Sequence, residues 1–290
     1  MTNKASYRQI LLFILLPGIP FLLFWILPLL SSVWLSFTNW DYISPSFDYV
    51  GIGNYTDLLT SSEFQQALKN TLIFAVASCV PILFFGFIFA LMINRLKQTS
   101  KFLQGLMFVP WITPMIGMSI VWSWMFNPQV GPINAVLEML GLPQPNWLTD
   151  SKVAIWAVII VTVWKNIGWA MLFFSDALSK IPMSLFDVAD VEGTSWWKRI
   201  RYIIIPMVSP TTLFLLIIIT LDSLQAYDQI NVLTQGGPSG STRTLLYYYY
   251  QLAFEQFNMG SATALAVLIL VLSAILSFVS IRLTKKYVYY

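Results

Sequence analysis

Two ionisable side chains lie inside long apolar stretches of this sequence and are the residues best placed to do chemistry. Lys165 lies between Trp164 and the polar Asn166. Asp222 is followed three residues later by the amide of Gln225. A charge at the centre of a bilayer costs at least ~2.5–3.5 kcal/mol, so it usually faces protein or a water-filled cavity. The pattern predicts that Lys165 either contacts a polar solute or pairs with Asp222 to fix helix packing.

Residues that could break or make covalent bonds are scarce. The chain has no His and a single Cys, Cys79, within an apolar stretch, which excludes Ser–His–Asp triads, disulfide frameworks and the usual zinc sites. The glycine-rich segment 236–240 lacks the Lys of a phosphate-binding loop and a preceding buried strand. We therefore expect no catalytic residue, no metal site and no cofactor, and any ATP must be bound by another chain.

The composition identifies the solvent that these residues meet. The 290 residues are 57% hydrophobic and 10% charged, whereas a soluble domain carries about 25% charged residues. The 12 Trp suit membrane–water boundaries, where aromatic rings concentrate. A net charge of +3, spread along the chain, does not indicate nucleic acid. The lipid bilayer is the expected partner of most of this surface.

Six stretches are long and apolar enough to cross that bilayer as helices, for which about 20 residues are needed. They cover residues 10–37, 68–93, 102–126, 153–178, 207–230 and 261–284. We expect one all-α transmembrane domain over residues 1–290. The first stretch is too long for a signal-peptide core and is expected to be retained. Its three prolines, Pro17, Pro20 and Pro28, are expected to kink it.

The basic residues are distributed unevenly between the loops that join these stretches. Short cytoplasmic loops carry an excess of Lys and Arg, so the asymmetry predicts that both termini are cytoplasmic. The residues placed on that side are Lys4, Arg8, Arg95, Lys97, Lys101, Lys180, Lys198, Arg199, Arg201, Arg282, Lys285 and Lys286. The opposite side would hold Lys69, Lys152 and Arg243, and the polar segments 38–63 and 127–152, which we expect to form ordered caps or short interfacial helices rather than unstructured connectors.

Residues 180–206 predict two short helices joined at Gly193, because glycine adopts the left-handed conformation that ends a helix. Pro182 suits the first turn of the first helix. Asp187 and Asp190 are three residues apart and share one of its faces.

The second helix of this segment is amphipathic. Ser195 can cap it, Trp196 and Trp197 are apolar, and Pro206 is expected to separate it from the next span. Such a helical pair either lies on lipid headgroups or docks a cytosolic partner.

The same segment resembles the EAA loop of binding-protein-dependent ABC importer permeases, with the pattern E-A-A-x-x-D-G-A and a later I-x-L-P. Asp187-Val-Ala189 stands for E-A-A, Glu192-Gly-Thr194 for D-G-A, and Ile203-Ile-Ile-Pro206 closes the motif. The departures conserve charge or size. In that family the loop is the coupling helix that enters a cleft of the ATPase subunit. The resemblance therefore implies a coupling role for Asp187, Val188, Ala189, Asp190, Glu192, Gly193 and Pro206.

A second match narrows the subfamily. Residues 227–254 look like the sugar-permease signature L-T-x-G-G-P, T-x-T-L and Y-x-x-A-F, which is typical of MalF-like rather than MalG-like subunits. Phe37-Thr-Asn-Trp40, Gly51-Ile-Gly-Asn-Tyr55 and Val109-Pro-Trp-Ile-Thr-Pro114 resemble the same subfamily. The tyrosines at 247–250 are equally consistent with an aromatic belt that has no substrate role.

The resemblance implies a MetI-like fold of six transmembrane helices in the cytoplasmic (inner) membrane of a prokaryote. The implied partners are a second, MalG-like permease subunit, a cytosolic ABC ATPase dimer, an extracytoplasmic solute-binding protein and a carbohydrate substrate. Sugars bind planar polar groups and aromatic faces, so the predicted pathway consists of Lys165, Asn166, Trp164, Asp222, Gln225, Tyr227 and Trp122. Trp122 is equally consistent with a lipid-facing position.

Two other classes of protein stay open at this point. In an ion-gradient-driven secondary transporter, Lys165 and Asp222 would carry the coupling. An intramembrane enzyme is disfavoured by the lack of a nucleophile–base set. Importers of oligosaccharides, monosaccharides, polyols and glycerol phosphate share the motifs above, so the solute itself is not specified.

Overall fold

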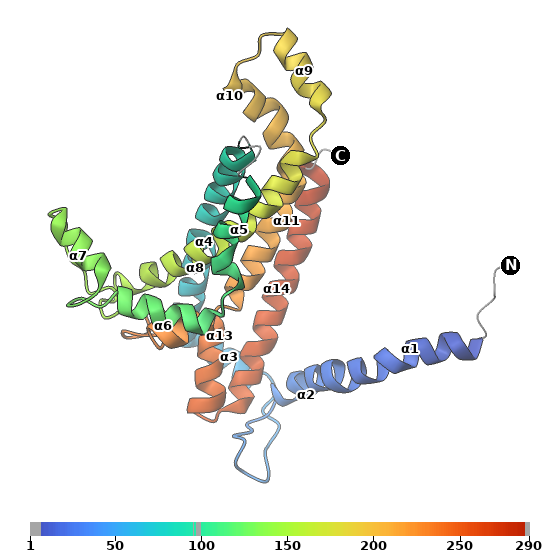
Figure 1. Ribbon diagram of the computed structural model, residues 1–290. Coiled ribbons are helices and arrows are strands. Elements are labelled where there is room, and N and C mark those ends of the chain that lie inside the picture. Colours follow the sequence, from blue (N-terminus) through green and yellow to red (C-terminus); the bar gives the residue numbers. More distant parts are fainter. Residues whose placement is uncertain (1–6, 95, 97–99, 288–290) are drawn as a thin grey trace. The chain divides into compact units, whose positions relative to one another are not determined.

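The computed structural model describes residues 7–94, 96 and 100–287, and over these residues its secondary structure is helical apart from one antiparallel bridge between Thr38 and Tyr49 (Figure 1). The chain forms two compact units. The first consists of Met1–Ser61 and Tyr249–Leu270, and the second of Ser62–Tyr248 and Val271–Tyr290. Helix α14 (Met259–Tyr287) contributes residues to both.

Five helical runs among the described residues are long and apolar enough to cross a membrane, and a bent pair of helices makes a sixth when it is counted as one span. This confirms the all-helical membrane class. Lys4, Arg95 and Lys97, which the sequence assigned to the cytoplasmic side, lie outside the described residues. The five unbroken runs are Phe13–Leu35, Ser62–Asn94, Ala154–Ser179, Trp196–Leu224 and Met259–Arg282.

In the first unit, α1 (Tyr7–Phe21) continues into α2 (Leu27–Leu35) through a π-helical turn at Leu22–Ile26. The prolines predicted to kink this stretch lie within the helical run or at the first turn of α2, and the run continues through them. A proline removes a backbone donor and its ring crowds the carbonyl four residues earlier. The π-helical turn between Pro20 and Pro28 lies where the regular ladder is under this strain.

The segment that follows α2 is ordered, as expected, and contains α3 (Gly53–Thr60). The side-chain amide of Asn54 donates hydrogen bonds to the carbonyls of Ser36 and Thr38, both at 2.8 Å. The backbone N–H of Gly260 donates to the carbonyl of Trp40 at 3.0 Å. These bonds tie residues 36–54 to the start of α14 within the first unit.

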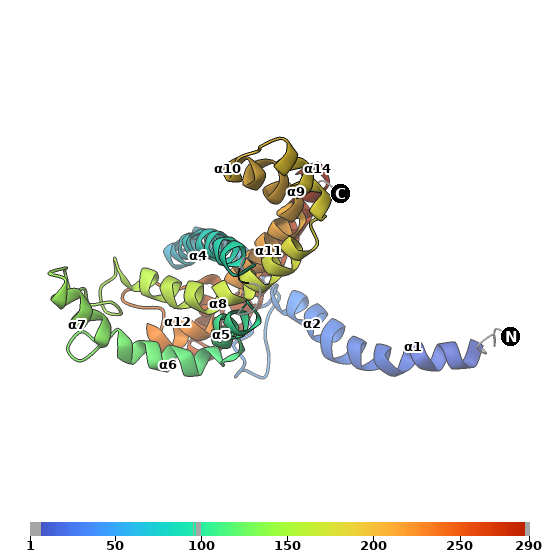
Figure 2. The same ribbon diagram turned by 45° about the horizontal axis from the view of Figure 1, so that its top comes forward.

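The second unit is built on α4 (Ser62–Asn94), α8 (Ala154–Ser179) and α11 (Ile205–Leu224), which lie side by side in both views (Figure 1, Figure 2). Gly86 of α4 faces Ala170 of α8 so closely that a Cβ on Gly86 would lie 2.8 Å from the Ala170 Cβ. Small residues allow such close approach between membrane helices, where packing rather than water exclusion drives association.

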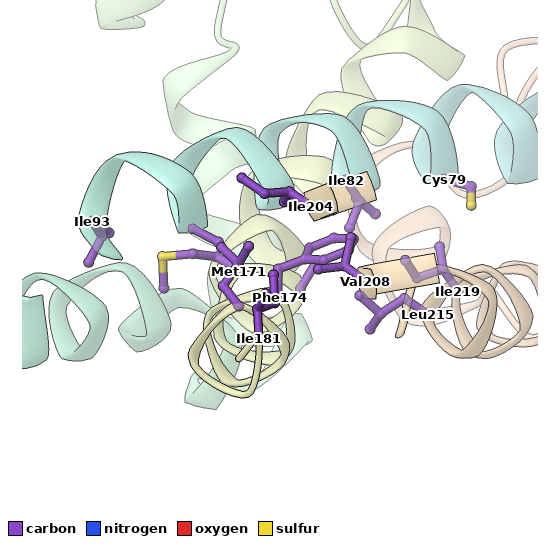
Figure 3. Close-up of a cluster of buried hydrophobic side chains, with 13 residues drawn as sticks. Cys79, Ile82, Ile93, Met171, Phe174, Ile181, Ile204, Val208, Leu215 and Ile219 are labelled. Carbon is purple, nitrogen blue, oxygen red and sulfur yellow. The ribbon is translucent and has the colours of Figure 1, made fainter. Parts of the chain in front are cut away.

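The core of the second unit lies between these three helices (Figure 3). Ile82 comes from α4, Met171 and Phe174 from α8, and Val208 and Leu215 from α11, and all five are at most 2% exposed. Their packing holds the helices in a fixed register and so positions the polar residues on the same helices.

The third predicted span is not one helix. It consists of α5 (Ser100–Ile112) and α6 (Met115–Met125), which are bent by 93° at Thr113 and Pro114. Proline disfavours the helical conformation of the residue before it and cannot donate to the ladder, so the break falls at this pair. The prediction of a single helix over residues 102–126 was wrong in this respect.

The fifth predicted span, residues 207–230, also differs. Helix α11 ends at Leu224 and a short α12 (Asp228–Leu233) follows after a three-residue connection. Gln225 and Tyr227 therefore lie outside both helices. The remaining α-helices of the described residues are α7 (Pro132–Met139), α9 (Met183–Val191), α10 (Trp196–Arg199) and α13 (Leu245–Tyr250).

The second long polar segment is ordered as well. Its helix α7 is held through Asn134, whose side-chain amide donates to the carbonyl of Pro145 at 3.2 Å. The indole Nε1 of Trp147 in turn donates to Asn134 Oδ1 at 2.8 Å. Asn134 therefore closes the segment onto itself.

Candidate functional site

The segment that resembles the EAA loop forms a helical hairpin, the α9–α10 hairpin, from Met183 to Arg199 (Figure 2). Gly193 ends α9 with a φ of +63°, the left-handed conformation predicted for it. The N–H of Thr194 donates to the carbonyl of Ala189 at 2.9 Å and closes the turn. Ser195 occupies the cap position of α10, but its side chain makes no capping hydrogen bond.

Arg199 joins the two helices of this hairpin. Its Nε donates to the carbonyl of Thr194 at 2.9 Å, and its Nη1 lies 2.6 Å from Asp190 Oδ1. A guanidinium presents several donors in a fixed fork, which suits simultaneous contact with a carbonyl and a carboxylate. The sequence showed Arg199 only as one of several basic residues on the polar side, because the fold of the turn decides which of them reaches back to α9.

The outer face of α9 is apolar and unusually exposed. Val191 is 91% exposed, Met183 71% and Val188 58%, whereas Ala189 is buried at 4%. Single exposed apolar residues are ordinary, but three on one nine-residue helix form a patch of the kind used in contacts with other proteins. Asp187, Asp190, Glu192 and Gly193 are exposed beside this patch.

The base of the hairpin is fixed to the membrane helices. Phe186 of α9 and Ile203 pack against the apolar core of the second unit. A cavity of about 350 Å³ at this junction is lined by residues of α4, α8 and the hairpin, including Asn94, Leu178 and Trp196. The hairpin is therefore packed against the helices that form the core.

Pro206 does not separate the hairpin from the next span, contrary to the expectation. The helix runs unbroken from Trp196 to Leu224, with a π-helical turn at Ile200–Ile204 directly before the proline. The turn relieves the clash that a proline ring causes in a regular helix. The second helix of the hairpin and the fifth span are thus one continuous element.

A polar cavity of about 380 Å³ opens between the helices of the second unit. Its lining comes from α4, α6, α8, α11 and α12. The lining residues are Phe74, Ser78, Ile82, Met115, Thr162, Lys165, Asn166, Ile219, Asp222, Ser223, Gln225, Asp228 and Gln229. Such a volume matches sites that hold small ligands.

The structure brings four of the predicted pathway residues together at this cavity, namely Lys165, Asn166, Asp222 and Gln225. The three predicted aromatic residues are not part of its lining. Trp122 and Trp164 pack edge to face with ring centroids 5.4 Å apart, and Tyr227 stacks on Tyr247 at 5.9 Å.

Five polar lining residues were not predicted as pathway residues: Ser78, Thr162, Ser223, Asp228 and Gln229. Thr162 lies three and four residues before Lys165 and Asn166, which places all three on one helical face. That spacing was a usable signal. Ser78 gives none, because a lone serine in an apolar helix usually bonds to its own backbone.

Lys165 is held by backbone carbonyls. Its ammonium donates to the carbonyls of Pro110 at 2.9 Å and Trp111 at 3.0 Å, and to that of Thr113. These carbonyls are exposed by the break between α5 and α6, where an unsatisfied group in hydrocarbon would be costly. Among the described residues Lys165 and Asp222 form no ion pair, so this structure does not support the alternative in which the two residues pair.

The signature between residues 233 and 245 forms a loop clamped onto α4. The amide of Asn70 donates to the carbonyls of Gly240 at 2.8 Å and Arg243 at 3.0 Å. The hydroxyl of Thr71 accepts the N–H of Leu245 at 2.9 Å. Residues 240, 243 and 245 of the signature thus have a structural role, whereas Asp228 and Gln229, near its start, line the polar cavity.

Residues 82–288 match the family described as "Binding-protein-dependent transport system inner membrane component". The chain is 32% identical over 279 residues to the trehalose/maltose transport system permease protein MalF of Thermococcus litoralis, covering 94% of each chain. It is 29% identical to the sn-glycerol-3-phosphate transport system permease protein UgpA of Agrobacterium fabrum, covering 92% of this chain and 90% of that one.

The fold is also found among solved structures. A chain of a bacterial ABC transporter involved in the import of the acidic polysaccharide alginate superposes with a TM-score of 0.83 at 24% identity, covering 96% of both chains. At this identity the likeness concerns the fold.

Proposed function

This chain belongs to the family of binding-protein-dependent transport system inner membrane components, and we propose that it carries a carbohydrate-like solute through its polar cavity. In this proposal the α9–α10 hairpin binds a separate ATPase and moves with it. As a family member it is a multi-pass inner-membrane permease of an ABC importer, a transport component without a catalytic domain. It is therefore not an ion-gradient-driven secondary transporter.

The observation that carries the transport proposal is the polar cavity among apolar helices. Amides and hydroxyls line it, namely those of Asn166, Gln225, Gln229, Thr162 and Ser223. These groups donate and accept hydrogen bonds without carrying charge, as the hydroxyls of a carbohydrate require. We include Lys165 and Asp222 in the pathway as lining residues.

The relatives support the choice of solute class. Two relatives are named for transport of trehalose/maltose and of sn-glycerol-3-phosphate, and a third is a multiple sugar-binding transport system permease, MsmF, of Streptococcus mutans. All three solute descriptions are of sugars or of a phosphorylated polyol. The proposed complex adds a second, MalG-like permease, a cytosolic ATPase dimer and an extracytoplasmic binding protein.

The proposed coupling contact uses the exposed apolar patch of α9. Met183, Val188 and Val191 would enter the ATPase, with Asp187, Glu192 and Gly193 at its rim. Because the hairpin continues into α11 and packs against the core, a shift of α9 on ATP binding would open or close the cavity. The basic residues near the hairpin favour a cytoplasmic position for it.

Co-purification tests this contact. Val191→Asp introduces a charge into the patch without touching the bonds that hold the hairpin together, and we expect the variant to insert normally but to lose the ATPase. Val130→Asp is a matched control, since Val130 is also exposed but lies far along the chain in another loop. Retention of the full complement of ATPase by the Val191→Asp variant would refute the coupling assignment.

A further inference from the structure

The charges of the polar cavity are not balanced. Asp222 ends the last turn of α11 and Asp228 begins α12, and both are exposed and line the cavity. Among the described residues neither carboxylate forms an ion pair, because the two ion pairs present there are Lys180–Asp176 and Arg199–Asp190. The cavity therefore contains two carboxylates without a partner.

The Lys165 ammonium is not available to bind an anionic solute in the cavity. It is the one basic residue among those described to line the cavity, and an ammonium has three donors. The carbonyls of Pro110, Trp111 and Thr113 occupy all three. A phosphate or carboxylate entering the cavity would have to displace these bonds in order to find a cationic donor.

The wall of the cavity also contains a buried hydroxyl. The side chain of Ser78 is 0% exposed and lines the cavity, and in the described part of the chain its Oγ has no hydrogen-bond partner. Buried polar groups are normally satisfied, so an unpartnered one at a cavity wall indicates a ligand or a water molecule that bonds to it. A hydroxyl donates and accepts, which matches the hydroxyl of a solute.

We propose that the cavity of this subunit selects uncharged polyhydroxylated solutes and rejects anionic ones, with Asp222 and Asp228 as the rejecting groups and Ser78 as a contact for solute hydroxyls. The proposal rests on the transport pathway proposed above and goes beyond it by choosing between solute types. A neutral di- or oligosaccharide fits this lining, whereas a sugar phosphate or a uronic acid would meet like charge in a partly desolvated space.

The charge of the cavity can be measured without knowing the solute. Replacing Cys79 with Ser removes the only cysteine, and Met115→Cys then places a thiol on the cavity wall. The assembled complex is treated with cationic trimethylammonium-ethyl and anionic sulfonato-ethyl methanethiosulfonate. The ratio of the two labelling rates is divided by the ratio at Gln144→Cys, a control position in an exposed loop.

We expect this normalised ratio to favour the cationic reagent by about tenfold or more, since two nearby carboxylates act in the same direction. It should fall to unity or below in the Asp222→Asn, Asp228→Asn double variant, in which Lys165 is the remaining charged residue of the described lining. Should the double variant fail to assemble, each single variant should lower the ratio by about threefold. The proposal would be overturned by a normalised ratio near unity in the parent. It would also be overturned by a ratio that stays the same when both aspartates are replaced.

The labelling reads the charge of the cavity whether or not the complex transports anything. A complex that does not transport carbohydrate but whose cavity reacts preferentially with the cationic reagent would refute the proposed pathway. The negative charge assigned to the cavity would still stand. Normal transport with no cationic preference would refute the charge selection alone.

Discussion

The Nη1 atom of Arg199 lies 2.6 Å from the Oδ1 atom of Asp190, so an ion pair joins the two helices of the α9–α10 hairpin. The Arg199 side chain is 20% exposed and that of Asp190 65%, which limits the ion pair itself to about 1 kcal/mol or less. The hydrogen bond from Arg199 to the Thr194 carbonyl is less exposed and adds about 1.5–3 kcal/mol. Together the ion pair and the hydrogen bond hold α9 and α10 in a fixed arrangement.

Replacing Arg199 with Met should loosen the hairpin without unfolding the chain. We expect amide hydrogen exchange in α9 and α10 to become about tenfold faster, because roughly 1.4 kcal/mol of local stability corresponds to that factor. ATP hydrolysis should respond less to the solute-loaded binding protein. Arg201→Met is the control, since Arg201 is exposed and its guanidinium lies 6.0 Å from the ring of Tyr202. Equal rates of amide hydrogen exchange in the two variants would contradict the role of Arg199 in holding the hairpin together.

The Lys165→Met variant should be less stable than the parent. It leaves the carbonyls of Trp111 and Thr113 without the Lys165 donor, whereas the Pro110 carbonyl keeps the hydroxyl of Thr113 at 2.6 Å. Each buried unsatisfied group costs about 1–3 kcal/mol. We expect the thermal midpoint of the purified protein to fall by several degrees, whereas Lys69→Met at an exposed position should leave it unchanged.

Adding Asp222→Leu to Lys165→Met tests the alternative that the two residues form a pair. Removal of both partners of a buried pair is often nearly neutral. Since Lys165 bonds to carbonyls, the second substitution should not restore stability. A double variant as stable as the parent would contradict the contacts seen here.

A glycine of α8 should tolerate no side chain. A Cβ on Gly168 would collide with the backbone carbonyl of Met107 in α5, and backbone atoms cannot move aside cheaply. Gly168→Ala should therefore prevent the packing of α5 on α8 and abolish assembly of the complex. Gly117→Ala in α6 meets nothing within 4 Å and should be neutral or stabilising by up to about 1 kcal/mol. Normal assembly of the Gly168→Ala variant, assayed by gel filtration, would count against this packing.

The orientation of the chain is open to labelling in whole cells. In the Cys79→Ser background, a cysteine at exposed Ser184 in α9 should react only with reagents that reach the cytoplasm. A cysteine at exposed Ser239, in the signature loop, should react with impermeant reagents from outside. The distribution of Lys and Arg predicts this result, and labelling of Ser184→Cys from outside would reverse the proposed topology.

Much of this architecture could be predicted from the sequence because the bilayer imposes length and composition on every span. The hairpin and the role of Gly193 were likewise predictable, since a left-handed glycine after a short helix has few other uses. Continuity through Pro206 was not, because a π-helical turn leaves no composition signal.

The candidate site was harder to predict. Lys165 and Asp222 stood out as charges in apolar stretches, but the partners of Lys165 are backbone carbonyls, which every residue carries and no sequence pattern marks. Pro114 was visible as a helix breaker, yet the apolar run continued across it. The Lys165 ammonium donates to carbonyls at the 93° bend, and these contacts are made across 52–55 residues.

The energy source of uptake tests the central claim most directly. The chain would be reconstituted in proteoliposomes with its second permease, ATPase and binding protein, and uptake of radiolabelled maltose and trehalose would be followed. The account predicts that uptake requires ATP and the loaded binding protein, persists when ionophores collapse ion gradients, and disappears with Val191→Asp. Uptake driven by an ion gradient in the absence of ATP, or full ATP-driven uptake by the Val191→Asp variant, would contradict it.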